Sequence, residues 1–272
     1  MRKRSPAAPL ADDEDDAGGD RQFVTALHRG LEVLRAFRPD DNQGLGNREI
    51  AERTGLPNST ISRLTYTLLK LGYLVYDDTT GRYRVGVPVL SLGLASLGGS
   101  WLRDIALPRM QQLADACGDG IMVALGGRDG MSMTYVACAR AAGVISLQLN
   151  VGSRISLTRS AMGRAYIAAA APGEREQILA QLRERTPPED LPRILDGIED
   201  ARQQIASRGF YANIGQWKPD VNAVSVPYLS PQVGNPPMAF NLGGPAYLLP
   251  PERLQDEFGP RLLELVRAVS RL

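Results

Sequence analysis

Residues 54–74 read TGLPNSTISRLTYTLLKLGYL, a segment that joins a proline turn, a polar start and a regular apolar stripe. Apolar residues recur there at intervals of three to five positions, which predicts a helix with one face buried against a core. Those residues are Leu56, Ile61, Leu64, Leu68 and Leu71. Pro57 suits the first turn of such a helix, and Gly72 suits the left-handed conformation that ends one. We therefore expect a helix of about four turns whose leading end stays polar.

The flanking residues predict two further helices and a hairpin. Thr25 is expected to cap a first helix, TALHRGLEVLRAF, and Asn47 to cap a short second helix, REIAERTG. The tight turn TGLPN then leads into the polar helix, an order typical of the helix-turn-helix. The strands YLVYD and RYRVG on either side of DTTG add a wing, so we predict a winged helix-turn-helix. The expected apolar face of the first helix is Ala26, Leu27, Leu31, Leu34 and Phe37.

The polar start of the third helix has a functional explanation. In a helix-turn-helix this end enters the major groove of DNA, while the apolar stripe holds the helix on its scaffold. Short polar side chains and arginines suit phosphates and base edges, and arginines of the wing are expected to reach the DNA backbone. In the alternative interpretation, Asn58 and Ser59 only cap the helix and Arg63 is an ordinary solvated charge. The predicted contacts to a double-stranded DNA operator are Arg48, Asn58, Ser59, Thr60, Ser62, Arg63, Tyr66, Arg82 and Arg84.

Composition limits what the rest of the chain can be. With 272 residues and 43% hydrophobic content, one or two globular domains are expected. Residues 1–20 hold three basic and six acidic side chains with almost nothing to bury, which predicts a disordered tail. Residues 21–86 hold ten basic and seven acidic side chains, an excess that suits a polyanionic partner. No apolar run of about 18 residues and no secretory signal occurs, so we expect a cytoplasmic protein with no membrane contact.

The sequence offers no recognisable catalytic machinery. Cys117 and Cys138 are too few for a four-ligand metal site, and they are expected to be buried free thiols. His28 is the single histidine and has no nucleophile motif to serve. No Walker loop or dinucleotide fingerprint occurs. We therefore predict no catalytic residues, no cofactor and no metal.

The C-terminal part predicts an α+β domain. The segments IMVALGG, MSMTYVACA and VISLQLN are expected to be strands separated by glycine-containing turns. Helices are expected near 160–171, 174–185 and 190–208, and further strands at 222–229 and 238–243. Runs of strands flanked by helices are typical of the α+β class.

Several segments together resemble one family. TALHRGLEVLRAF, LGNREIAERTGLPNSTISRLTYTLLKLGYLVYDDTTGRYRVGVPVLSLG, GSRISLTRSAMGRA and SRGFYANIGQWKPDVNAVSVPY are similar to the IclR (isocitrate lyase regulator) family of bacterial transcription factors. The resemblance implies a winged helix, a linker helix and a GAF-like α/β effector-binding domain, assembled as homodimers or dimers of dimers. We accordingly expect a charged tail at 1–20, a DNA-binding domain at 21–86, a linker helix at 87–104 and an effector-binding and oligomerisation domain at 105–272.

A site for an anionic effector is expected where a turn leads to the helix SAMGRAYIAAAA. Free amides at the helix start near Ser160, with a guanidinium nearby, favour a carboxylate. The resemblance adds the segments 222–225 and 240–243 to this pocket. In the alternative, Arg154 is only a surface charge or an ion-pair partner. The predicted effector residues are Leu149, Gly152, Ser153, Arg154, Leu157, Ser160, Ala161, Met162, Ala223, Val224, Phe240 and Asn241.

The chain departs from the family pattern at this pocket. The family commonly has Pro-Leu-His where residues 156–158 read Ser-Leu-Thr, and a cysteine where Ala223 stands. Members that bind small keto acids have serines in place of Asn241 and Gly243. We therefore expect a larger effector, an aromatic or other organic acid.

Three functions remain to be separated. The first is an effector-responsive regulator without catalysis, dimeric because two reading helices match a pseudo-palindromic operator. The second is a DNA-binding assembly module whose GAF-like domain is empty and purely structural. The third is an enzyme that carries the winged helix as an accessory, which the missing nucleophile and base disfavour.

Overall fold

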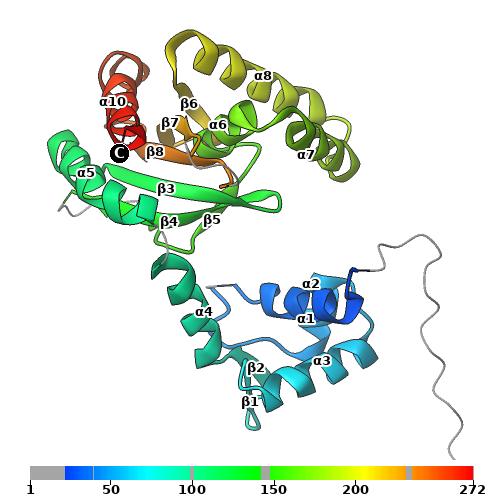
Figure 1. Ribbon diagram of the computed structural model, residues 1–272. Coiled ribbons are helices and arrows are strands. Elements are labelled where there is room, and N and C mark those ends of the chain that lie inside the picture. Colours follow the sequence, from blue (N-terminus) through cyan, green and yellow to red (C-terminus); the bar gives the residue numbers. More distant parts are fainter. Residues whose placement is uncertain (1–21, 39, 99–100, 142–147, 231–234, 272) are drawn as a thin grey trace, which may run out of the picture. The chain divides into compact units, whose positions relative to one another are not determined.

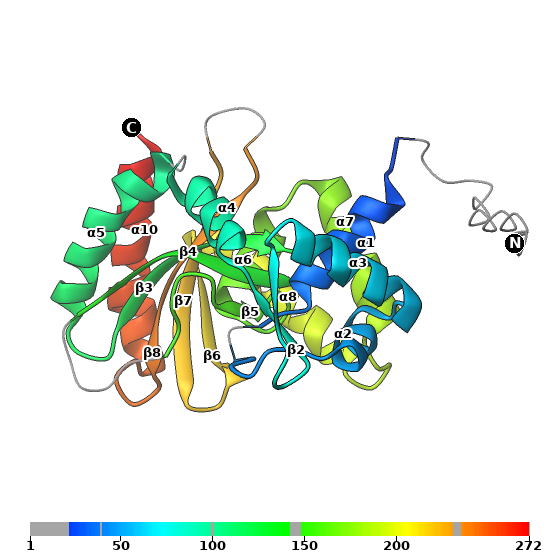
Figure 2. The ribbon, with the colours of Figure 1, turned by 90° about the horizontal axis from the view of Figure 1, so that it is seen from below.

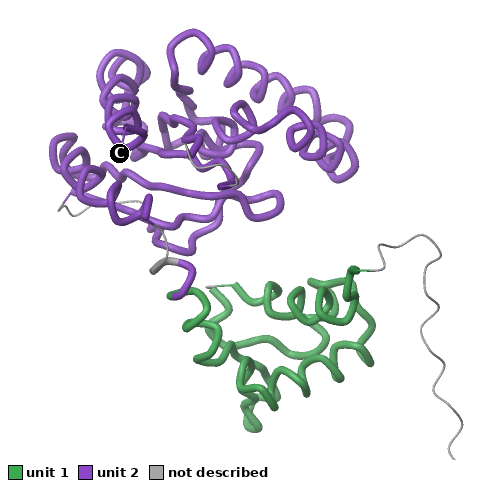
Figure 3. Tube along the Cα trace, in the orientation of Figure 1, with its two compact units in different colours: residues 1–94 green, residues 95–272 purple. Residues whose placement is uncertain are grey.

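The computed structural model describes residues 22–271 except 39, 99–100, 142–147 and 231–234. The chain divides into two compact units, residues 1–94 and 95–272 (Figure 3). The boundary lies within a helix that begins in the first unit. Each unit has its own hydrophobic core.

The N-terminal unit is a winged helix-turn-helix, as the sequence predicts (Figure 1). Helices α2 and α3 are joined by the turn that holds Gly55, whose φ of 72° is left-handed. Gly72 ends α3 with a φ of 75°, also as predicted. The elements are α1 Thr25–Arg35, α2 Asn47–Thr54, α3 Asn58–Lys70, β1 Leu74–Asp77, β2 Arg82–Val85 and α4 Val87–Gly98, with β1 and β2 antiparallel.

The two predicted N-caps are wrong by one residue. Val24 precedes α1, and no side chain caps that helix. Gly46 precedes α2, and its N–H donates to the Glu49 Oε2 atom at 2.8 Å. A glutamate at the third helical position can therefore satisfy the helix start when the cap residue itself has no side chain.

The core of the N-terminal unit uses only part of the predicted apolar stripes. Ile61 and Leu68 are buried, as expected, but Leu71 is 61% exposed. On α1, Leu27 is 62% exposed and Leu31 is 50% exposed, so these two predictions were wrong. The helix carries apolar residues around more of its circumference than one core contact needs, and periodicity alone did not identify the buried side. The buried core is Val33, Ala36, Leu45, Ile50, Ile61, Leu68 and Leu74.

The C-terminal unit is built on one antiparallel sheet of six strands in the order β5-β4-β3-β8-β7-β6. Figure 2 shows these strands with helices on both sides of the sheet. The strands are β3 Met122–Asp129, β4 Ser132–Arg140, β5 Arg154–Ser156, β6 Tyr211–Lys218, β7 Val221–Tyr228 and β8 Met238–Pro245. The helices are α5 Trp101–Cys117, α6 Ala161–Ala169, α7 Pro172–Arg185, α8 Leu191–Arg208, α9 Pro251–Arg253, a π-helical turn Leu254–Phe258 and α10 Gly259–Ser270.

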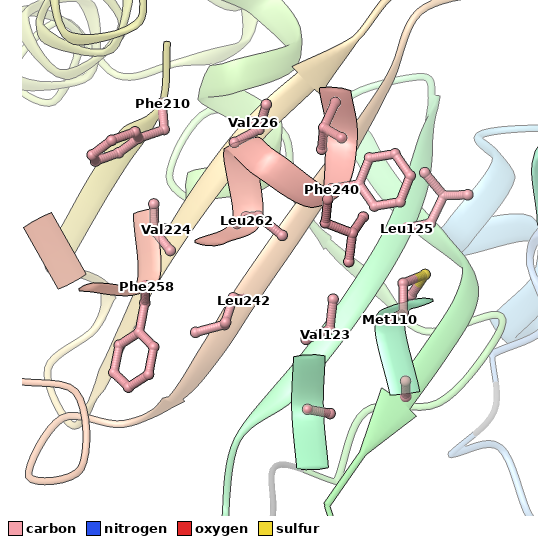
Figure 4. Close-up of a cluster of buried hydrophobic side chains, with 14 of the residues drawn as sticks. Met110, Val123, Leu125, Phe210, Val224, Val226, Phe240, Leu242, Phe258 and Leu262 are labelled. Carbon is pink, nitrogen blue, oxygen red and sulfur yellow. The ribbon is translucent and has the colours of Figure 1, made fainter. Parts of the chain in front are cut away.

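Each face of the sheet is covered by a different set of helices. Helices α5 and α10 pack on one face, where Val224 and Phe240 join a large apolar cluster with Met110 and Leu262 (Figure 4). Helices α6, α7 and α8 pack on the other, over Met122 and neighbouring side chains. We call these the α5/α10 face and the α6 face. Because side chains alternate along a strand, adjacent residues contribute to different cores.

The predicted elements of this unit differ from the structure at three places. Of the expected strand 144–150, residues 144–147 lie outside the described residues, and 148–150 are not strand. The expected turn at 152–154 runs into the short strand β5. Strand β6 and helix α10 were not predicted. The sequence YANIGQWK carries a glycine with a φ of 63°, and this positive φ falls where the pairing of β6 with β7 becomes irregular.

Replacement of Phe240 tests the assignment of the two faces. Phe240→Ala should destabilise the C-terminal unit by about 3–5 kcal/mol, the usual cost of emptying a core aromatic site. Chemical denaturation of the full chain would measure this loss. Leu229→Ala, at a residue that is 59% exposed, is the control and should change little. A Phe240→Ala protein with unchanged stability would contradict the assignment.

Candidate DNA-reading helix and effector cavity

The leading half of α3 presents an open polar surface. Asn58, Ser59 and Arg63 are exposed, and Tyr66 is 61% exposed. Among the described residues, Arg63 makes no ion pair, so its guanidinium is available to a base or a phosphate. Thr60 is half-buried beside them. This arrangement suits a helix that reads DNA, with the opposite side fixed by Ile61, Thr65 and Leu68.

Two other predicted contacts have partners within the unit. Ser62 Oγ donates to the Asn58 carbonyl at 3.0 Å and accepts from Asn47 Nδ2 at 3.2 Å. Ser62 therefore links α2 to α3 at their exposed edge. Arg48 pairs with Glu52 at 2.9 Å, but its side chain is 88% exposed. An exposed pair of this kind contributes little stability and can be exchanged for a phosphate contact.

The wing arginines differ from each other. Arg82 donates to both Glu49 carboxylate oxygens at 2.7 Å and to the Gly44 carbonyl at 3.1 Å. The Gly46 N–H and then Arg82 lower the pKa of Glu49 below its ordinary value. Arg82 thus fastens the wing to α2, and its contact with the DNA backbone stays a prediction. Arg84 lies 3.6 Å from Asp77 with 56% of its side chain exposed, so it can still reach a phosphate.

A small cavity of about 20 Å³ lies between the start of α6 and the α6 face of the sheet. Four predicted effector residues line it: Ser160 and Ala161 from the helix start, Ala223 from β7 and Asn241 from β8. Gly243, also in a predicted segment, lines it too. The structure therefore brings together the helix start and the two strands that the sequence analysis expected to meet.

The other predicted effector residues lie elsewhere. Val224 and Phe240 lie on the α5/α10 face (Figure 4). Val224 follows Ala223 on β7 and Phe240 precedes Asn241 on β8, so their side chains point away from the cavity. Leu157 and Met162 are fully buried in the core beneath α6, and Leu149 packs against that core. None of these five lines the cavity.

The turn that was expected to bind the carboxylate is not part of the cavity. Gly152 is left-handed with a φ of 87°, and Ser153 Oγ accepts from the Asn150 N–H at 2.8 Å. Arg154 lies 3.5 Å from Asp129 and is 44% exposed at its side chain. The alternative interpretation, a turn with a surface ion pair, fits this geometry. Gly152, Ser153 and Arg154 therefore do not line this cavity, and their contact with an effector stays a prediction.

Five lining residues were not predicted. They are Tyr135, Ile155, Asn213, Trp217 and Val221. Val221 could have been found, because it lies two residues before Ala223 on the same face of β7. Tyr135 is 3% exposed, and burial raises the pKa of its hydroxyl, so it is a neutral wall residue. Asn213 and Trp217 come from β6, the strand that the sequence analysis missed.

Asn241 is the polar group that stands out in this wall. It is 5% exposed, and no hydrogen bond of its side chain exists among the described residues. The neighbouring polar groups are occupied: Ser160 Oγ donates to the Ser156 carbonyl at 2.6 Å and accepts from the Gly163 N–H at 3.0 Å. Asn213 Nδ2 donates to the Arg159 carbonyl at 2.9 Å. The fully buried polar atoms that lack a partner do not include those of Asn241, so its amide faces the cavity and is open to a ligand.

Two absences hold for the part of the chain that the structure describes. Within it, no helix combines the length and apolar character that a membrane span needs. No group of three or more histidine, cysteine or acidic side chains is placed there to hold a metal ion.

A winged helix-turn-helix with an open reading helix, joined in one chain to an α/β unit, defines a DNA-binding transcriptional regulator. The chain belongs to the IclR family. Residues 26–78 match the model of the IclR helix-turn-helix domain, and residues 95–271 match that of the bacterial transcriptional regulator IclR C-terminal domain. Proteins of this family are transcriptional regulators, so the chain is not an enzyme.

Known relatives agree with this assignment. The HTH-type transcriptional regulator TsaQ1/TsaQ2 of Comamonas testosteroni is 32% identical over 91% of this chain and 88% of its own. An IclR family transcriptional regulator from Brucella abortus is 44% identical, covers 95% of this chain and 96% of its own, and has a TM-score of 0.85. An IclR homolog from Microbacterium hydrocarbonoxydans, solved in complex with 4-hydroxybenzoate, shares the fold at 22% identity with a TM-score of 0.61, over 90% of this chain and 96% of its own.

Arg63 is the residue whose loss tests the reading helix. Arg63→Ala should weaken binding to a selected operator by about 1–3 kcal/mol, the worth of a good base contact, without changing the melting temperature. Gel-shift titration and thermal melting would separate the two effects. Arg82→Ala is the contrasting variant and should lower the melting temperature, because it breaks the contact with Glu49. Unchanged operator affinity in Arg63→Ala would show that another face of α3 reads the DNA.

Proposed function

We propose that this regulator is controlled by an organic acid that binds in the cavity between α6 and the sheet. The observation that carries this proposal is the Asn241 amide, which lines this cavity and makes no side-chain hydrogen bond among the described residues. The fully buried polar atoms that lack a partner do not include those of Asn241, so its amide is open to the cavity and can bind a ligand oxygen without losing a bond within the protein. Asn241 Nδ2 is the donor for one oxygen of the acid.

The start of α6 supplies the remaining attraction for a negative charge. Ser160 is the N-cap, and the N–H groups of the first turn of a helix lack intrahelical acceptors. Their aligned dipoles favour an anion, and Ser160 and Ala161 both face the cavity. None of the described residues that line the cavity is an arginine or a lysine, so in this proposal amides bind the carboxylate and no salt bridge is required.

The body of the acid is proposed to be aromatic. Tyr135, Ile155, Trp217 and Val221 provide an apolar and aromatic wall opposite the polar groups. The 4-hydroxybenzoate bound by the Microbacterium homolog makes that compound the first one to test here. An aromatic acid has a flat apolar body and a charged end, and this matches the two kinds of wall.

Binding requires the cavity to open. Its volume of about 20 Å³ holds roughly one water molecule. The half-buried Trp217 lies beside the irregular pairing of β6 with β7, which makes the end of β6 the place where the wall can yield. A ligand that binds only the open form shifts the protein toward that form, and operator affinity changes if the two forms differ in it.

The small volume also favours the second candidate, a regulator whose C-terminal unit is closed, empty and purely structural. The two candidates differ in calorimetry. An effector-controlled protein binds an acid with measurable heat and changes its operator affinity. A purely structural unit binds none of the acids in the panel.

We further propose that the chain acts as a homodimer through the apolar surface of its N-terminal unit. Leu27 and Leu31 on α1 are half or more exposed, and Leu92 on α4 is 57% exposed. With Leu71, they line a groove of about 800 Å³ beside α3. A second copy is the occupant that the function calls for, because two reading helices about one DNA turn apart match a pseudo-palindromic operator.

Asn241 provides the sharpest test of the effector site. Asn241→Leu should leave the melting temperature of the ligand-free protein near that of wild type, because it replaces, at nearly constant volume, a cavity-facing amide that makes no side-chain hydrogen bond among the described residues. The same change should abolish binding of 4-hydroxybenzoate or of another acid found in a calorimetric panel. Ala223→Phe should also block binding by filling the cavity, whereas Arg154→Ala should leave it intact. Full binding by Asn241→Leu and Ala223→Phe would place the effector elsewhere.

Leu31 tests the dimer. Leu31→Glu should weaken operator binding about tenfold or more, because a buried unpaired carboxylate disfavours association. Sedimentation should show the corresponding loss of dimer, with an unchanged melting temperature for the DNA-binding unit. Leu229→Glu, at a similarly exposed leucine of the other unit, is the matched control. Operator affinity that is insensitive to Leu31→Glu would contradict a dimer through this surface.

A further inference from the structure

A second and larger cavity lies on the other side of the α6 start. Its volume is about 630 Å³, and its walls come from the residues before α6, from α6 itself, from α8 and from β6. It shares no lining residue with the small cavity that Asn241 lines, which we call the effector cavity. Its charged walls include Arg159, Arg164 and Arg193 on the positive side and Asp196, Asp200 and Glu189 on the negative side.

Arg164 is the most buried of the positively charged residues that line this cavity. The residue is 3% exposed, and its guanidinium donates to the Thr158 carbonyl at 2.9 Å, to the Tyr211 hydroxyl at 2.5 Å and to Gln216 Oε1. All three acceptors are neutral. No carboxylate of the described residues forms an ion pair with it. A buried charge normally has an opposite charge beside it, so Arg164 retains the capacity to bind one.

The fold makes room for this guanidinium at one glycine. A Cβ atom at Gly197 on α8 would overlap the Arg164 guanidinium. Gly197 therefore lets the positive group lie directly against the helix that carries the acidic wall. The arrangement places a buried cation and the acidic side of α8 around one cavity.

Asp200 is the most buried of the acidic residues that line this cavity. It is half-buried one turn after Gly197, and both its carboxylate oxygens accept from Gln204 Nε2 at 2.9 Å. That donor is neutral, and Asp200 has no ion-pair partner in the described part of the chain. Burial raises the pKa of Tyr211, Arg164 lowers it and Asp200 raises it, so both charges act on the same hydroxyl. Both charges thus act on the Tyr211 hydroxyl, and among the described residues the side-chain hydrogen bonds of each go only to neutral groups.

We infer that this cavity binds an α-amino acid. Its carboxylate would lie beside Arg164 and Arg159, and its ammonium beside Asp200 and Asp196. An α-amino acid carries both charges within a few bonds, which matches two opposite charges in one cavity that form no ion pair among the described residues. Pro192 and the buried Ile194 give its side chain an apolar wall. A simple anion would leave Asp200 unpaired, and a simple amine would leave Arg164 unpaired.

The hydrogen bonds of Arg164 also connect this cavity to the effector cavity. The Gln216 N–H donates to Asn213 Oδ1 at 3.1 Å, and Asn213 lines the effector cavity. Gln216 also accepts from Arg164. A carboxylate at Arg164 competes with Gln216 for the guanidinium, so the two cavities are linked through Asn213 and Gln216.

The first experiment is a thermal-shift survey of the full chain with each of the twenty standard amino acids. We expect at least one to raise the melting temperature. Calorimetry with that amino acid, its deaminated acid and its decarboxylated amine then tests the need for both charges. Each single-charge analogue should bind about tenfold or more weakly, the usual consequence of leaving one buried charge unpaired. Failure of all twenty to bind, or equal binding by the deaminated acid, would overturn the inference.

Variants place the binding in this cavity. Asp200→Asn keeps an acceptor for Gln204 but removes the charge, so binding should weaken about tenfold or more while the melting temperature stays near that of wild type. Asp256→Asn, at an exposed aspartate near the C-terminal helices, is the matched control and should bind normally. Ala223→Phe, which fills the other cavity, should also bind normally. Binding that survives Asp200→Asn, or is lost in Ala223→Phe, would contradict an amino-acid site here.

Discussion

The structure of the C-terminal unit depends on one constraint, the alternation of side chains on a sheet that is covered on both faces. Strand β8 lies inside this sheet, between β3 and β7, so each of its residues must suit one face or the other. Phe240 and Leu242 enter the α5/α10 face. Ala239 enters the α6 face, and Asn241 and Gly243 line the small cavity there. A shift of one residue would exchange the apolar core for the polar cavity wall.

The same alternation explains why a cavity exists at all. Ala223 and Gly243 are paired across β7 and β8, and both point to the α6 face, where larger side chains would fill the space. Above them, α6 is held close because Gly163 packs directly against the Leu157 backbone. Arg164 then ties α6 to Tyr211 at the start of β6. The helix start is thus fixed on several sides around a small space, which suits it to respond when a ligand enlarges that space.

Sequence patterns predicted the elements whose local chemistry is distinctive. The reading helix could be recognised because its polar start, apolar stripe and terminal Gly72 agree with one another. Ser160, Ala161, Ala223 and Asn241 could be placed together through the family resemblance, and the structure brings them together. Val224 and Phe240 were misplaced because a segment was assigned to the pocket as a whole, although adjacent residues on a strand face opposite ways. The exposure of Leu27 and Leu31 was not predicted, because the sequence pattern identifies an apolar face of the helix but not whether that face contacts the core or another molecule. The ion pairs of Arg82 and Arg154 join residues distant in sequence, and no local pattern reveals them.

We propose that the α6 face of the sheet binds the effector, whereas the α5/α10 face is only a core. A crystal structure of the protein with an acid identified by calorimetry tests this proposal most directly. We expect ligand density against Ala161, Ala223 and Asn241, with the carboxylate at the start of α6 and Trp217 displaced from its present position. Density beside Arg154, or between the sheet and α10, would contradict it.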